Sequence, residues 1–189
     1  MLQVTDLIFD YSDKLLLQNV NFSVKPGTVL HIQGKNGVGK TTLLKLLAGL
    51  LQPIKGHITG AGQSCYVGHQ NGVNLSLTPD EHMRFDLGVQ DKAILDKALT
   101  RLNLKNARDT PCGLLSAGQK RRVGLLRLLI MEAKLWLLDE PLVGLDTAGM
   151  DILGDLIKAH LKQAGMVILT AHQVLPFDLN ARVLKELVL

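Results

Sequence analysis

Long apolar runs are missing from this sequence. No stretch approaches the ~20 consecutive apolar residues that a membrane-spanning helix needs, so we expect no membrane span. The first residues also lack the basic and apolar segments of a secretory signal, which favours an intracellular location. No internal repeat, low-complexity tract or linker interrupts the 189 residues. We therefore expect one domain, residues 1–189, with no room for a second enzymatic domain.

Cysteine and net charge are also scarce. The two cysteines, Cys65 and Cys112, lack the spacing of metal ligands, so we expect buried free thiols. The formal net charge is only +4, and the densest basic run, Lys-Arg-Arg at 120–122, is short. We interpret this run as a solvated helix face, although basic residues near a membrane surface also fit the pattern, and we expect no nucleic-acid partner.

The pattern of apolar residues predicts an α/β fold with a mostly parallel sheet. Alternation from residue 2 to 24 predicts antiparallel strands. Four short apolar runs are typical of parallel strands covered on both faces, at 29–33, 65–67, 135–138 and 166–169. Apolar spacing predicts helices over 42–51 and 91–102. The second of these lies in a more polar region, approximately 71–115, which we take as a small helical subdomain.

A glycine-rich loop follows the first of these runs. Residues 34–41 read Gly-Lys-Asn-Gly-Val-Gly-Lys-Thr and match GxxxxGK[ST] between a strand and a helix. Backbone amides of such a loop surround phosphate oxygens, Lys40 reaches the β- and γ-phosphates, and the Thr41 hydroxyl binds magnesium. The sequence therefore predicts binding of a nucleoside triphosphate with Mg²⁺. The candidate nucleotide-binding residues of this segment are Gly34, Asn36, Gly37, Gly39, Lys40, Thr41 and Thr42.

Polar side chains at strand ends supply candidate partners for the loop. Asp139 and Glu140 follow the run 135–138. Because side chains alternate along a strand, we assign Asp139 to magnesium and Glu140 to the general base. His172 follows a later run, and ligands bind beyond the carboxyl ends of parallel strands, so we expect it near the γ-phosphate. Gln70, just past another strand, is a candidate contact for magnesium or water.

The segment Leu-Ser-Ala-Gly-Gln at 115–119 begins a helix, with Ser116 as a good N-cap. The helical subdomain that carries it should stand apart from the chain's own phosphate loop. A second copy of the protein could therefore supply this segment in trans.

These motifs, in this order and over nearly the whole chain, resemble those of the nucleotide-binding subunits of ATP-binding cassette (ABC) proteins. The resemblance implies a P-loop NTPase fold of the ABC type, with an N-terminal antiparallel β subdomain, a mostly parallel core sheet and a small helical subdomain. It implies that Tyr11 stacks on adenine, that Asp146 in the D-loop communicates across a dimer, and that His172 is the switch histidine. In a head-to-tail dimer, Ser116, Gly118 and Gln119 would act on the partner's ATP. Ala117 stands where the family usually has a second glycine.

One branch of the family matches in further detail. The runs Gly-His-Gln-Asn-Gly-Val at 68–73 and Thr-Ala-His-Gln at 170–173 are similar to those of the haem exporter ATP-binding proteins of bacterial cytochrome c maturation. The resemblance implies an ATP hydrolase that is peripheral on the cytoplasmic face of the inner membrane. An integral membrane subunit would dock between Gln70 and Phe85. The activity would serve haem export or release of a haem–chaperone complex.

Other readings of the motifs stay open at this point. The chain could be a soluble ABC-type ATPase clamp without a membrane partner. It could also be a small-molecule phosphate-loop kinase, although a kinase needs no 115–119 segment. A module that only binds nucleotide is a further alternative, and Glu140 favours turnover over it.

Overall fold

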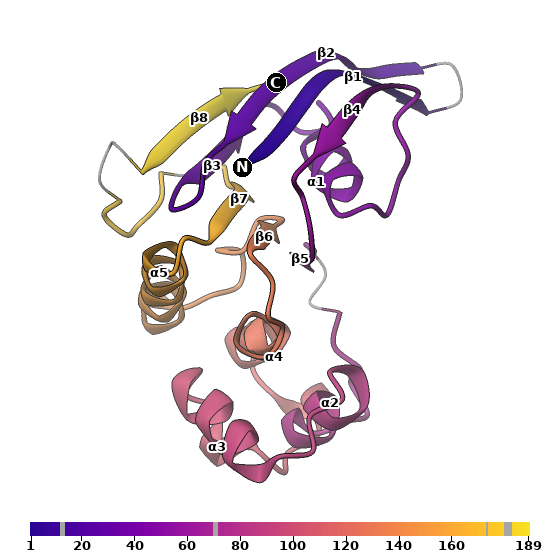
Figure 1. Ribbon diagram of the computed structural model, residues 1–189. Helices are drawn as coiled ribbons and strands as arrows, with labels where there is room; N and C mark the ends of the chain where they lie inside the picture. The colour runs from indigo at the N-terminus through magenta and orange to yellow at the C-terminus, as the bar shows by residue number, and fades with distance from the viewer. Residues whose placement is uncertain (12–13, 70–71, 173, 180–182) are drawn as a thin grey trace.

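The computed structural model describes residues 1–11, 14–69, 72–172, 174–179 and 183–189. Within them lie two β-sheets (Figure 1). The larger sheet is parallel and has the order β5-β6-β7-β3-β8. Its strands are β5 (Ser64–Val67), β6 (Leu135–Leu138), β7 (Met166–Thr170), β3 (Val29–Gln33) and β8 (Leu184–Val188). The smaller sheet is antiparallel, with β1 (Leu2–Tyr11) between β2 (Lys14–Val24) and β4 (Lys55–Thr59).

The parallel sheet is covered on both faces, as continuous apolar runs require. Leu135 and Leu137 of β6 pack into one core with the antiparallel sheet and helix α1 (Lys40–Leu47). Trp136 and Leu138 of the same strand pack into a second core with α4 (Ala117–Ile130) and α5 (Thr147–Lys162). Successive residues of β6 thus pack into different cores on the two faces of the sheet. The predicted α/β fold is confirmed.

The remaining helices lie in residues 72–115, which we call the helical region. It contains α2 (Pro79–Asp86), α3 (Lys92–Arg101) and two short 3₁₀ helices, Lys105–Ala107 and Cys112–Leu114. In Figure 1, α2 and α3 lie at the opposite end of the molecule from the antiparallel sheet and α1, with α4 between. No helix in the described ranges combines the length and apolar character needed to cross a membrane. Cys65 and Cys112 are buried and free, as predicted.

The helix starts divide into two kinds. Helices α2, α3, α4 and α5 begin at residues whose side chains accept a hydrogen bond from a first-turn amide. These caps are Thr78, Asp91, Ser116 and Asp146. Helix α1 begins at Gly39 and, among the α-helices of the described residues, is the one without a side-chain cap.

One boundary prediction was wrong. The helix predicted to reach residue 51 ends at Leu47, because Gly49 adopts a left-handed φ of 73°. The Leu50 amide then donates to the Lys45 carbonyl and the Gly49 amide to the Leu46 carbonyl, which is a Schellman closure. Strand β8 was missed, because this edge strand is largely exposed and carries Lys185 and Glu186 instead of a continuous apolar run.

Candidate functional site

The glycine-rich loop joins β3 to α1 and depends on glycine geometry. Gly37 has a φ of 80° and Gly39 a φ of 110°, both in the region that side chains disfavour. A Cβ atom on Gly39 would also lie 2.8 Å from Cδ2 of Leu17 in β2. The loop can therefore turn tightly against the antiparallel sheet and present its amides inward.

Lys40 lies inside this loop. Its side chain is only 7% exposed, and its Nζ donates to the carbonyl oxygens of Gly34 at 2.7 Å and Lys35 at 3.0 Å. The ammonium group is thus held at the place where the uncapped first turn of α1 also directs its partial positive charge. Both features favour an anion such as a phosphate.

A cavity of about 630 Å³ opens in front of the loop. Its wall includes Asn36, Gly37 and residues 39–42 of the loop, together with His69, Asp139, Glu140 and His172. The structure therefore brings most of the predicted site residues to one place. Gln70 lies outside the described residues.

Thr41 and Asp139 form the candidate metal position. The Thr41 hydroxyl donates to Oδ2 of Asp139 at 2.9 Å, and the Thr170 hydroxyl donates to Oδ1 at 3.0 Å. Neighbouring oxygen ligands in an octahedral Mg²⁺ shell, with bonds of about 2.0–2.1 Å, lie roughly 2.9 Å apart. The hydroxyl and the carboxylate therefore fit magnesium in donor type and in separation. Burial first, and then nearby Asp139, raise the pKa of Tyr66 on β5 to about 12, so this phenol stays neutral.

Glu140 lies beyond the end of β6 and has a left-handed φ of 48°. A backbone turn therefore separates Asp139 from Glu140, and the strand alternation used to assign their roles does not extend to Glu140. The Glu140 amide donates to the Thr170 hydroxyl at 2.8 Å, and Oε1 lies 2.7 Å from Nε2 of His172. Sequence reasoning anticipated His172 but missed His69, whose Nδ1 lies 3.4 Å from Oε2 of Glu140.

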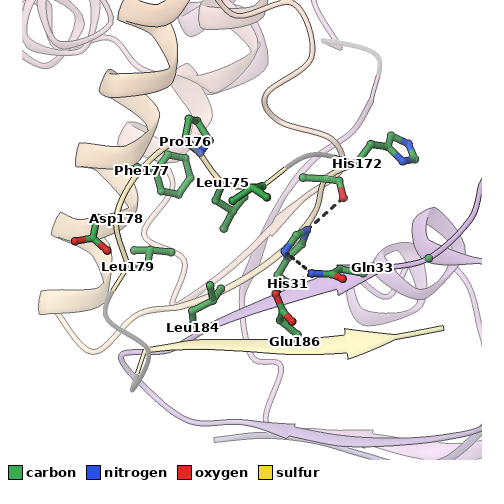
Figure 2. Close-up of a pocket in the computed structure, with 13 residues that line it drawn as sticks. His31, Gln33, His172, Leu175, Pro176, Phe177, Asp178, Leu179, Leu184 and Glu186 are labelled. Carbon is green, nitrogen blue, oxygen red and sulfur yellow. Dashed lines mark hydrogen bonds between the residues drawn. The ribbon is translucent and has the colours of Figure 1, made fainter.

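A further set of polar contacts, formed by Glu186, Gln33 and His31, reaches the backbone directly before His172 (Figure 2). The Gln33 amide nitrogen donates to Oε1 of Glu186 at 2.8 Å and lies 3.4 Å from Nδ1 of His31. Because an amide nitrogen only donates, Nδ1 accepts and Nε2–H of His31 donates to the Ala171 carbonyl at 3.2 Å. His31, 4% exposed, thus fixes the backbone directly before His172.

We expect His31→Leu to destabilise the full chain by about 1–3 kcal/mol, because the Ala171 carbonyl loses its donor in a buried position. Chemical denaturation measures this difference. His57→Leu is the matched control, since His57 is an exposed strand residue, and we expect it to change stability by no more than about 0.5 kcal/mol. Equal effects of the two substitutions would contradict the assignment.

The segment 115–119 and Asp146 do not line the cavity. Ser116 and Gln119 form a capping box: the Gln119 amide donates to the Ser116 hydroxyl at 3.2 Å, and the Ser116 amide donates to Oε1 of Gln119 at 2.9 Å. Gly118 packs against the loop before α5, where a Cβ would lie 3.4 Å from the Gly144 carbonyl oxygen. Asp146 caps α5 by accepting from the Gly149 amide at 2.9 Å.

Tyr11 also lies outside the cavity wall. It is half-exposed at the end of β1, and its ring contacts Phe9 edge-on, with centroids 4.9 Å apart. Its stacking on adenine stays a prediction.

The interpretation of the basic run as a solvated face was wrong. Arg121 is 2% exposed and Arg122 is 6% exposed. Helix α4, which carries them, packs between the parallel sheet and the helical region, so it has little solvent-facing surface. Lys120 alone of the three is partly exposed, and it donates to the Gly113 carbonyl.

Known proteins resemble this chain in sequence and in fold. A family model described as "ABC transporter" matches residues 17–143. The "Cytochrome c biogenesis ATP-binding export protein CcmA" of Legionella pneumophila (strain Lens) is 47% identical over 94% of this chain and 96% of its own. The protein of the same name from Vibrio parahaemolyticus is 38% identical, over 92% of each chain. A putative ABC transporter ATP-binding protein from Pyrococcus furiosus matches in structure, with a TM-score of 0.80, 28% identity and coverage of 98% and 96%.

Proposed function

This chain belongs to the ABC transporter family of ATP-binding proteins, and we propose that it is the ATP-hydrolysing subunit of a membrane complex for cytochrome c biogenesis. The observation that carries the proposal is the 47% identity, over nearly the full length of both chains, to a relative named as an ATP-binding export protein of cytochrome c biogenesis. The site supports it, because the phosphate loop faces a carboxylate pair and a histidine across one cavity.

The loop residues would bind and orient ATP. Backbone amides of the loop and the Lys40 ammonium would hold the β- and γ-phosphates. Thr41 and Asp139, with Gln70 as a further candidate, would hold Mg²⁺, which neutralises phosphate charge when bound. The remaining loop side chains, Asn36 and Thr42, line the same cavity and would contact the nucleotide. Tyr11 would stack on the adenine.

Glu140 would act as the general base. A water oxygen attacks the γ-phosphorus, the bond from that phosphorus to the β–γ bridging oxygen breaks, and ADP leaves with the bonding electrons. The carboxylate of Glu140 takes the proton from the attacking water. His172, within 2.7 Å of this carboxylate, would hold it in place and donate to the γ-phosphate.

A second copy of the chain would complete the site. The Ser116 hydroxyl accepts from the Gln119 amide, so its own O–H is left to donate to a phosphate oxygen of the partner's ATP. Gly118 and Gln119 would lie beside it in the head-to-tail dimer. Asp146, near the Gly118 contact with residue 144, would carry the state of one site to the other.

The membrane partner would be an integral subunit that docks between Gln70 and Phe85. Two large apolar side chains are exposed in this segment, Phe85 at 74% and Leu75 at 57%. The chain would then be peripheral on the cytoplasmic face of the bacterial inner membrane. Its ATP hydrolysis would drive haem export or the release of a haem–chaperone complex.

A complementation experiment tests the proposal. In a bacterium whose own copy is deleted, this chain is expected to restore haem-containing c-type cytochromes, measured by haem staining, and to co-purify with an integral membrane protein. The control is Lys45→Ala, which changes an α1 residue outside the cavity wall. This variant should restore the cytochromes as the wild-type chain does. A chain that stays in the soluble fraction and restores no cytochrome would favour a soluble ABC-type clamp.

A further inference from the structure

Arg121 on α4 joins two segments of backbone that flank the catalytic cavity. Its guanidinium donates at 2.9–3.3 Å to carbonyl oxygens of both segments. The acceptors are Gly68 and His69, which follow β5, and Asp139, Glu140 and Pro141, which follow β6.

The shape and charge of arginine explain how one side chain donates hydrogen bonds to both segments. The guanidinium is planar and presents its donors as a rigid fork, so it can reach both segments at once. Burial lowers the pKa of Arg121 below its ordinary value, while Asp139 and Glu140 act in the opposite direction. The group remains charged. A cation at 2% exposure is therefore kept among carbonyl dipoles and near the carboxylates.

The contact with Glu140 matters because the backbone of this residue is strained. A non-glycine residue at a φ of 48° persists only where its surroundings hold it. The Thr170 hydroxyl accepts from the Glu140 amide, and Nη2 of Arg121 donates to the Glu140 carbonyl at 2.9 Å. The residue is thus held at its amide from β7 and at its carbonyl from α4.

Helix α4 also carries Ser116 at its N-terminus, one and a half turns before Arg121. Helix α4 would contact the partner's ATP through Ser116. Through Arg121 it is also hydrogen-bonded to the backbone of Glu140 in the site of its own chain. The fork also reaches the His69 carbonyl, and the ring of that residue approaches the same carboxylate.

We propose that Arg121 is a positioning residue that fixes the backbone of Glu140 from α4, so that the water-activating carboxylate moves with the helix that carries Ser116. The inference rests on the proposed function, because it assigns Arg121 a role in that ATP hydrolysis.

The test compares ATP turnover by Arg121→Lys and wild type, each as the full chain with its co-purifying membrane proteins. Lysine keeps the charge but cannot bridge both segments. We expect kcat to fall about 10- to 100-fold, as for displaced catalytic groups, while KM and the affinity for a fluorescent ATP analogue change less than about threefold. Arg127→Lys is the control, since Arg127 lies on the same helix and donates to the Tyr66 carbonyl. We expect it to lower kcat less than about twofold.

A second background separates positioning from general damage. In Glu140→Asp, the carboxylate is already displaced, so Arg121→Lys should lower kcat by a much smaller factor than in wild type. An equal factor in both backgrounds, or losses of affinity and thermal stability that match the loss of kcat, would overturn the inference.

The remaining outcomes are equally decisive. If Arg121→Lys does not fold, Arg121→Gln repeats the test without the buried charge, and failure of both to fold would overturn the inference by making Arg121 a stability residue. Wild-type turnover with unchanged kcat in Arg121→Lys would overturn the inference alone. Absence of wild-type turnover would overturn the proposed function as well.

Discussion

Glu140→Gln is expected to bind ATP with nearly wild-type affinity and to lose its hydrolysis. The amide has the size of the carboxylate but cannot accept the proton of the attacking water. General-base catalysis contributes about 10²–10⁴-fold, and we expect kcat to fall by at least the lower figure. Because ATP would then persist in the site, the ATP-bound dimer should accumulate.

Two measurements check this prediction. Phosphate release gives the loss of turnover, and size-exclusion chromatography with ATP and Mg²⁺ gives the dimer. Glu132→Gln makes the same chemical change at an exposed position after α4 and should turn over normally. Adding Ser116→Arg to Glu140→Gln should abolish the dimer, since it places a bulky side chain where the partner's ATP would lie. Unchanged turnover in Glu140→Gln would remove Glu140 from the mechanism.

Lys40→Ala is expected to weaken ATP binding by about 10- to 100-fold, because a charge-assisted hydrogen bond contributes roughly 1.5–3 kcal/mol. Hydrolysis should fall further, since the same ammonium would stabilise charge that develops on the γ-phosphate. Titration with a fluorescent ATP analogue measures the affinity.

Lys45→Ala is the matched control for Lys40→Ala. It removes the same charge from the same helix, in the last turn and outside the cavity wall. Its affinity for the analogue should stay within about twofold of wild type, as for most surface substitutions. Equal loss of affinity in both variants would show that net charge on α1, not the position of Lys40, governs binding.

The sequence predicted those features that local pattern determines. Short, mostly apolar runs located β3, β6 and β7, because strands covered on both faces are built largely from apolar residues. The glycine-rich loop located Lys40 and Thr41, because few sequences turn from strand to helix in this way. The contact of His172 with Glu140 follows from the rule that the carboxyl ends of parallel strands meet at one edge.

Other features depended on contacts between distant residues. Arg121 was misread because a charged run on a helix is usually solvated, and only the packing of α4 shows that its carbonyl partners come from two other segments. The role of His31 could not be predicted from its place in an apolar run, because its partner, the Ala171 carbonyl, lies 140 residues later in the sequence. His69 likewise meets Glu140 only through the pairing of β5 with β6.

The absence of a side-chain N-cap on α1 has a consequence for the order of events in a catalytic cycle. The other α-helices of the described residues carry their own N-caps, so they are complete before any ligand arrives. At Gly39 the terminal phosphates would fill the position that a serine or aspartate side chain fills elsewhere. Nucleotide binding would then complete the hydrogen bonding at the N-terminus of α1, and product release would remove it. The stiffness of the chain near α1 would rise and fall with each turnover.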